Sequence, residues 1–304
     1  MIEGERMKVV CIGHSTYDIT LPMNEYPTEN IKYRLDRHIE CGGGPASNGA
    51  YLLAKWGMDT TIMSVLGEDY YADKIIESFE QIGANTKYLE KRSDHATSSS
   101  YIIANMGNGS RTVLTSKKPP KRKLQMDTSV DADLILIDGE HPETALQVLL
   151  ENKDAISVID AGRLNPDTKM LGKLVTYLVC SKDFAEEFCD TKLDYKNHEQ
   201  LVNCHKQLQE YSKTNVIITL ESHGSFTIID GEYERIPSIT VKAVDSTGAG
   251  DIFHGAFTYF IGNNYPLRDA IRYSSITAAI SVTRIGARYS IPELKEVLEY
   301  DDVI

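Results

Sequence analysis

The chain has 304 residues, with 32 Lys or Arg against 44 Asp or Glu and a formal net charge of −12, so neither nucleic acid nor an anionic membrane is expected as its main partner. Its five cysteines contain no C-x-x-C pair and its eight histidines no metal-ligand spacing, which argues against a disulfide framework or a zinc site. The chain starts without a signal-peptide pattern and no apolar run reaches membrane length, so a cytoplasmic location is expected.

In the first half of the chain, buried elements alternate with polar, strand-like stretches. The predicted buried elements are a strand at 8–13, a helix opening at 42–48, a strand at 61–66 and a helix at 70–82. The polar stretches, at about 14–40 and 98–116, fit poorly in a buried sheet, and the second carries glycines at a hairpin tip. They are predicted to form a small β lid.

The second half of the chain alternates strand and helix strictly. The predicted strands are 134–137, 156–159, 177–180 and 216–220, and the predicted helices are 142–151, 166–174, from 185, 199–211, 267–281 and 292–300. A hairpin is predicted at 226–236, and Ile239 to Val244 has the alternation of a further strand. This order predicts one α/β domain over 1–304, with a doubly wound, mostly parallel sheet flanked by helices.

The loop Asp245-Ser-Thr-Gly-Ala-Gly-Asp251 opens a helix whose apolar residues fall at one-face spacing, at 252, 253, 256, 257 and 260. The first N–H groups of a helix lack internal partners and carry the positive end of the dipole. Glycines at 248 and 250 let an anion approach those groups. Asp251 in the first turn adds a carboxylate that can take a hydroxyl proton, so the loop has the parts of a phosphoryl-transfer site.

Several polar residues follow predicted strands and should gather at one edge of the sheet, where ligands bind in such folds. They are Asp18, the 42–48 loop, Asp138, Glu140, Asp160, Ser181, Glu221 and the 245–251 loop. This convergence favours a functional role for Asp251 over that of a simple capped helix.

Two segments together resemble signatures of the ribokinase/PfkB family of carbohydrate kinases. They are Gly43-Gly-Pro-Ala-Ser-Asn48 and Asp245-Ser-Thr-Gly-Ala-Gly-Asp-Ile-Phe-His-Gly255, with Ser246 in place of the usual Thr. Segments 219–224, 282–287 and 290–292 also match at compatible spacing, so the resemblance covers nearly the whole chain. Segments 108–112 and 179–185 look most like the ketohexokinase branch.

The resemblance implies an ATP-dependent sugar kinase with the ribokinase-like fold, and it assigns roles to individual residues. Asp251 matches the general base, and the backbone of Gly248, Ala249 and Gly250 matches the anion hole. The positions matching sugar contacts are Asp18, Gly43, Gly44, Asn48, Arg111 and either Asp138 or Glu140. The positions matching the nucleotide site are Ser181, Thr219, Glu221 and Gly224, together with Gly248 and Gly250. Those matching a monovalent-cation site, expected to take K⁺, are Asp245, Thr247, Ser281, Arg284, Gly286 and Ser290.

Family members use ATP with Mg²⁺, and two departures bear on this chemistry. The N-x-x-E motif that helps organise Mg²⁺ is replaced by Ser181 and Phe184, which leaves water, Asp183 or Glu186 to assist. Lys and Asn of ribokinase are replaced here by Pro45 and Thr16, which weakens ribose as the expected substrate.

Three further expectations concern the acceptor, the assembly and a salt bridge. A nucleoside kinase on the same fold and a non-catalytic sugar or nucleotide sensor are the alternative functions. Exposed lid strands invite pairing with a second copy, so a homodimer through the lid is a hypothesis. Arg163, in Asp160-Ala-Gly-Arg163, is expected to form a structural salt bridge rather than a ligand contact.

Overall fold

The computed structural model describes residues 6–116 and 123–300, and within these ranges nine strands form one large sheet. Its order is β13-β12-β11-β10-β9-β8-β1-β4-β5. The strands are β1 (Lys8–Ile12), β4 (Asp59–Gly67), β5 (Asn85–Arg92), β8 (Leu134–Ile137), β9 (Ile156–Ala161), β10 (Tyr177–Ser181), β11 (Asn215–Thr219), β12 (Ser225–Ile229) and β13 (Glu232–Ile236). Only the pairs β11–β12 and β12–β13 are antiparallel within this sheet, so the predicted doubly wound, mostly parallel sheet is confirmed.

Helices cover both faces of this sheet because its central strands bury side chains on both sides. In β1, Val9 and Cys11 pack into one core, and Val10 and Ile12 into the other. The first core is covered by α1 (Pro45–Lys55), α2 (Tyr70–Glu80), α7 (Ala249–Gly262), α8 (Leu267–Ser281) and α9 (Leu294–Tyr300). The second is covered by α3 (Pro142–Glu151), α4 (Pro166–Leu171), α5 (Lys182–Cys189) and α6 (His198–Ser212). No helix in the described ranges is long and apolar enough to cross a bilayer.

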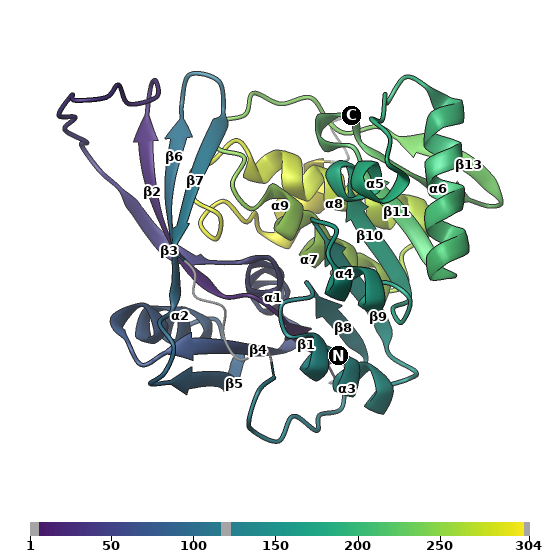
Figure 1. The fold of residues 1–304 in the computed structure, drawn as a ribbon, viewed down its shortest axis with the longest axis horizontal. Coiled ribbons are helices and arrows are strands. Elements are labelled where there is room, and N and C mark those ends of the chain that lie inside the picture. Colours follow the sequence, from purple (N-terminus) through teal and green to yellow (C-terminus); the bar gives the residue numbers. More distant parts are fainter. Residues whose placement is uncertain (1–5, 117–122, 301–304) are drawn as a thin grey trace.

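The two polar stretches form a second, four-stranded sheet, at the left in Figure 1. Its strands are β2 (Thr16–Met23), β3 (Ile39–Gly43), β6 (Ser98–Asn105) and β7 (Ser110–Ser116), in the order β3-β2-β6-β7. The prediction that these stretches leave the main sheet is therefore right, although β3 begins only at Ile39. Asp18 lies inside β2 rather than in a loop after β1.

The strand predicted from Ile239 to Val244 is wrong, because this segment pairs with no strand. It is extended and leads from the sheet edge at β13 to α7. The N–H groups of Val244 and Asp245 both donate to the carbonyl of Val282, which follows α8. Alternation of apolar residues is typical of a strand, but the N–H groups at the end of this segment donate to the end of a helix and not to a neighbouring strand.

Helices α1 and α7 approach each other at two glycines. A Cβ on Gly255 would lie 2.8 Å from Cα of Gly49, and a Cβ on Gly49 would lie 2.4 Å from a methyl carbon of Leu136. Both distances are shorter than a real side chain tolerates. The close contact sets the N-termini of α1 and α7, which carry Asn48 and Asp251, next to each other.

We expect Gly255→Ala to destabilise the protein, because overpacking a tight core costs about 1–3 kcal/mol. Helix propensity opposes this loss by at most about 1 kcal/mol. Gly162→Ala is the matched control, because a Cβ there makes only an ordinary contact, 3.6 Å from Asp160. Urea unfolding of both variants measures their free energies of unfolding. Equal values for Gly255→Ala and Gly162→Ala would show that the two helices can move apart without cost.

Candidate active site

The loop before α7 brings the chain into the helix through a left-handed residue. Gly248, the N-cap, has φ 76°, and a Cβ on it would lie 2.9 Å from the Cβ of Ala287. A Cβ on Gly250 would meet nothing within 4 Å, so the first turn of the helix borders open space there. The N–H of Ala249 makes only a long contact of 3.4 Å with the carbonyl of Ser246. The predicted anion-hole residues therefore sit where a ligand can reach unpaired helix donors.

Asp251 is held by a side chain from the other helix. The Nδ2 of Asn48 donates to Oδ2 of Asp251 at 2.7 Å. Asn48 is 1% exposed, and its Oδ1 has no hydrogen-bond partner. Gly44 caps α1 with φ 98°, and a side chain on it would strike the carbonyl of His14. The signature glycine therefore permits the turn that positions Asn48.

Asp18 joins this pair from the small sheet. Its side chain lies so close to Gly43 that a Cβ there would be 2.0 Å from its Oδ2, and its Oδ1 lacks a partner. Burial, reinforced by the negative charge of Asp251, raises the pKa of Asp18 to about 7. The structure thus places Asp18, Gly43, Asn48 and Asp251 in one site, with two buried acceptor oxygens unsatisfied.

Asp138 follows β8, and its carboxylate is already fully engaged with the backbone. Its Oδ2 accepts from the N–H of His14 at 2.8 Å and of Ala46 at 3.1 Å, and its Oδ1 accepts from the N–H of Glu140 at 3.0 Å. Burial nevertheless raises its pKa to about 6, although these bonds act in the opposite direction. Asp138 therefore fixes the start of α1, and Glu140 lies two residues further on with a similar partial exposure.

Arg111 links the small sheet to the loop before α7. Its Nη1 donates to the carbonyl oxygen of Ser246 at 2.9 Å and to its hydroxyl at 2.6 Å. At the same hairpin tip, a Cβ on Gly109 would lie 2.8 Å from atoms of Ala243. The β6–β7 hairpin therefore rests on the loop that leads to Asp251.

The residues predicted to hold a monovalent cation do converge, around Asp245. Its carboxylate is 2% exposed and accepts from the N–H and hydroxyl of Thr247, at 2.9 and 2.6 Å, and from the N–H of Gly286 at 2.9 Å. The N–H of Ser290 donates to the carbonyl of Gly286. The Arg284 side chain turns away to pair with Glu296, and the hydroxyl of Ser281 donates back to its own helix.

The residues predicted to contact the nucleotide lie after β10 and β11, and two of their hydroxyls have structural partners. Ser181 caps α5 by accepting from the N–H of Phe184 and donates to the carbonyl of Gly162. The Thr219 hydroxyl donates to the carbonyl of Cys180. Glu221 is exposed with φ 54°, and Gly224 has φ 93°. Within this turn the N–H groups of His223 and Gly224 already donate to the carbonyls of Leu220 and Glu221.

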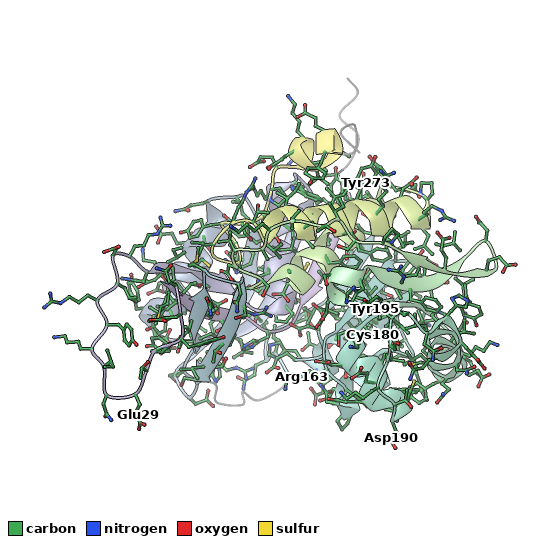
Figure 2. The ribbon with its side chains drawn as sticks, turned by 90° about the horizontal axis from the view of Figure 1, so that it is seen from above. Glu29, Arg163, Cys180, Asp190, Tyr195 and Tyr273 are labelled. Atoms are coloured by element: carbon green, nitrogen blue, oxygen red, sulfur yellow. The ribbon has the colours of Figure 1, made fainter. Side chains whose placement is uncertain are left out.

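Two predictions for the acidic residues are corrected. Asp160 pairs with His254, at 3.1 Å from Nδ1, and not with Arg163. Arg163 is exposed, and Figure 2 shows it near the middle of the view, not far from Cys180. Glu186 is buried and bound by Lys192 and by the N–H of Leu193, so it is unsuited to assist Mg²⁺. No three His, Cys, Asp or Glu side chains of the described ranges converge as a metal site.

Arg288 is a buried cation next to α1 that was not predicted from the sequence. Arg288 is 3% exposed, and its guanidinium lies 4.4 Å from the ring centre of Phe79. It donates to the hydroxyls of Ser47 and Ser78 at 2.7 and 2.6 Å. Its positive charge lowers the pKa of Asp18, although burial outweighs this effect. No local pattern distinguishes a buried arginine from an exposed one.

Comparison with known proteins agrees with this geometry. The model of the pfkB family carbohydrate kinases matches residues 6–294. Ribokinase of Staphylococcus aureus is 28% identical over 95% of this chain and 98% of its own length. The structure of a putative ribokinase from Agrobacterium tumefaciens superposes with a TM-score of 0.84 at 23% identity, covering 98% of both chains. That of Arabidopsis thaliana ribokinase, complexed with ribose and ATP, gives 0.75 at 22% identity, over 97% of this chain and 98% of its own.

The fold and the paired signature loops define a kinase of the ribokinase-like class. The chain belongs to the pfkB family of carbohydrate kinases. It is therefore a phosphotransferase with an alcohol group as acceptor, and the resemblance seen in its two signatures is confirmed.

The raised pKa of Asp18 predicts a pH-dependent stability of the free protein. A carboxyl whose pKa is about 7 folded and about 3.9 unfolded stabilises the fold only while protonated, so stability falls as pH rises between these values. We expect Asp18→Asn to be more stable than the parent, with the difference growing by on the order of 2–3 kcal/mol between about pH 5 and about pH 8.

Urea unfolding at the two pH values measures this difference. Asp154→Asn is the control, because it removes a charge that is exposed to water. A difference for Asp18→Asn that does not change with pH would contradict the assignment.

Proposed function

We propose that the protein is an ATP-dependent sugar kinase that transfers the γ-phosphate to a primary hydroxyl of a small carbohydrate. The observation that carries this proposal is the pair of buried acceptor oxygens without partners, on Asp18 and Asn48, beside Asp251. An unsatisfied buried acceptor is costly, and the hydroxyls of a polyol are donors that would satisfy both.

Asp251 is the proposed general base. Its Oδ2 accepts from Asn48, which fixes the carboxylate at the open end of α7. A hydroxyl placed against it loses its proton to the carboxylate as its oxygen attacks the γ-phosphorus, and the bond from that phosphorus to the bridging oxygen breaks, so that ADP leaves. The N–H groups of Gly248, Ala249 and Gly250 stabilise the negative charge that develops on the transferred group, which is the main requirement of this reaction.

ATP and Mg²⁺ fit the donor set of the site. The helix N-terminus offers backbone donors to the phosphates of the nucleotide, and Mg²⁺ when bound would neutralise charge on those phosphates. Because the described side chains form no metal cage, Mg²⁺ would be held mostly by phosphate and water. The exposed carboxylate of Asp183 remains available to contact its waters.

Two classes of acceptor fit Asp18 and Asn48, because these residues can hold the ring of a nucleoside as well as that of a free sugar. An ATP-consumption screen over hexoses, pentoses, ketoses and nucleosides, supported by thermal shifts, separates these substrates. Turnover of ATP with any of them would dismiss a non-catalytic sensor, which has no need of a base.

We further propose that the small sheet is a lid over the sugar and that two copies pair through it. Arg111 already joins this sheet to the loop before α7. Strand β7 lies at an edge and exposes Val113 and Leu114, at 44% and 58%. Unpaired, exposed edges invite a second strand. Light scattering should give the mass of two chains for the parent protein and the mass of one chain for Leu114→Asp. A parent protein with the mass of one chain would contradict the dimer.

Asp251→Asn should remove most turnover, because general-base assistance is typically worth about 10²–10⁴ in rate. Sugar binding should be largely retained, since Asn keeps the size of the side chain. Coupled-assay kinetics and calorimetric titration measure the two effects. Asp269→Asn is the matched control, at the same third position of α8, and should be fully active. Near-normal turnover of Asp251→Asn would refute the mechanism.

Potassium should raise turnover several-fold over the same concentration of tetramethylammonium. The buried carboxylate of Asp245 is tied to both loops that flank the anion hole, through the N–H groups of Thr247 and Gly286. A small monovalent ion held there would order the backbone of 245–250. Initial rates at constant ionic strength test this, and equal rates in both salts would count against a cation site.

A further inference from the structure

His254 lies on the buried side of the first turns of α7, three residues after Asp251 and four after Gly250. Its side chain is 5% exposed. Its Nδ1 lies 2.6 Å from the carbonyl oxygen of Gly250 and 3.1 Å from Oδ2 of Asp160, and its Nε2 lies 3.2 Å from the carbonyl oxygen of Val179. The imidazole therefore joins α7 to the ends of β9 and β10.

The two carbonyl oxygens around the ring can only accept a hydrogen bond, and the same holds for the Asp160 carboxylate when it is ionised. A neutral imidazole has one donor and one acceptor nitrogen, so one of its nitrogens would face an oxygen lone pair. Protonation at both nitrogens resolves this conflict and makes His254 an imidazolium ion. Asp160, 8% exposed, then supplies the counter-charge.

The environment of Asp160 disfavours its ionised form, and His254 is the group that opposes this. Burial raises its pKa to about 7, the negative charges of Asp251 and Asp138 act in the same direction, and His254 opposes them. A carboxylate buried among other carboxylates keeps its charge only if a positive group faces it. His254 is the group that does so here.

The contact with Gly250 reaches the peptide unit that joins the proposed anion hole to Asp251. The carbonyl of Gly250 belongs to the same planar peptide unit as the N–H of Asp251. Fixing this oxygen from the sheet side therefore fixes the orientation of that N–H and the place where the Asp251 side chain begins. The imidazolium also puts a positive charge behind the loop at which negative charge would develop.

We propose that His254 and Asp160 form a positioning pair for the reaction, in which a protonated His254 locks the Gly250–Asp251 peptide and Asp160 keeps the imidazole protonated. The inference rests on the function proposed above for Asp251 and the 248–250 backbone. Neither residue contacts the reacting atoms in this scheme.

Three variants test the pair. His254→Gln loses the donor to Gly250, and kcat should fall about 10–100-fold with little change in KM, because small misplacements cost up to about 10² in rate. His254→Asn places an amide donor near the position of Nδ1 and should recover part of kcat. Asp160→Asn should lower kcat as well. The double variant with His254→Gln should lose less kcat than the product of the two single losses.

Thr258→Val is the matched control for structural damage. Thr258 is fully buried one turn further along α7, and its hydroxyl donates to the carbonyl of His254. Its loss should lower the melting temperature while leaving kcat unchanged. If Thr258→Val lowers kcat as much as His254→Gln does at an equal loss of stability, His254 and Asp160 have only a structural role.

The charge of His254 is measured independently in the parent protein. Nitrogen-15 NMR of the histidine rings, assigned by the resonances lost in His254→Asn, should show both nitrogens protonated near neutral pH. A neutral ring, or a His254→Gln variant with parental kcat, would overturn the inference. An active Asp251→Asn would instead refute the proposed function, so the two failures are distinguishable.

Discussion

The contact between α1 and α7 at Gly49 and Gly255 is the constraint on which the site depends. Without Cβ atoms at these positions the two helix backbones come close enough for Asn48 to reach Asp251 at 2.7 Å. Two helix N-termini, one after the signature glycines and one after the 245–248 loop, then open toward the same space. Chemistry that needs donors and a carboxylate together follows from this packing.

The electrostatics of the site follow from burying several carboxylates near one another. Burial raises the pKa of Asp18, Asp138 and Asp160, and the structure offsets the cost in three different ways. Asp138 accepts three backbone hydrogen bonds and Asp160 faces His254. Asp18 keeps an unsatisfied oxygen, and a hydrogen bond from Ser100 and the charge of Arg288 lower its pKa without offsetting burial. The least compensated carboxylate is the one that a substrate hydroxyl would satisfy. Stability and binding are opposed at this residue.

Much of the fold and the centre of the site could be predicted because their signals are local. The buried runs, the capping glycines and the loop that ends at Asp251 each depend on residues close in sequence. The failures have the opposite origin. The strand expected at 239–244 has the right alternation, yet it pairs with no strand, and the N–H of Val244 donates to Val282 at the end of α8. Arg163 is close to Asp160 in sequence, yet the partner is His254, on a helix that joins only in the folded chain.

The sequence by itself determined the class of fold, the family and the residue that ends the anion loop, because hydrophobic period, glycine placement and signature spacing are properties of short segments. Only the tertiary structure decided which polar groups are occupied and which are free. It engaged Asp138, Ser181, Thr219 and Glu186 with neighbours, left oxygens of Asp18 and Asn48 without partners, and buried Arg288 and His254. Hydrogen bonds between segments far apart in the chain are set by packing, and packing is not written in any one segment.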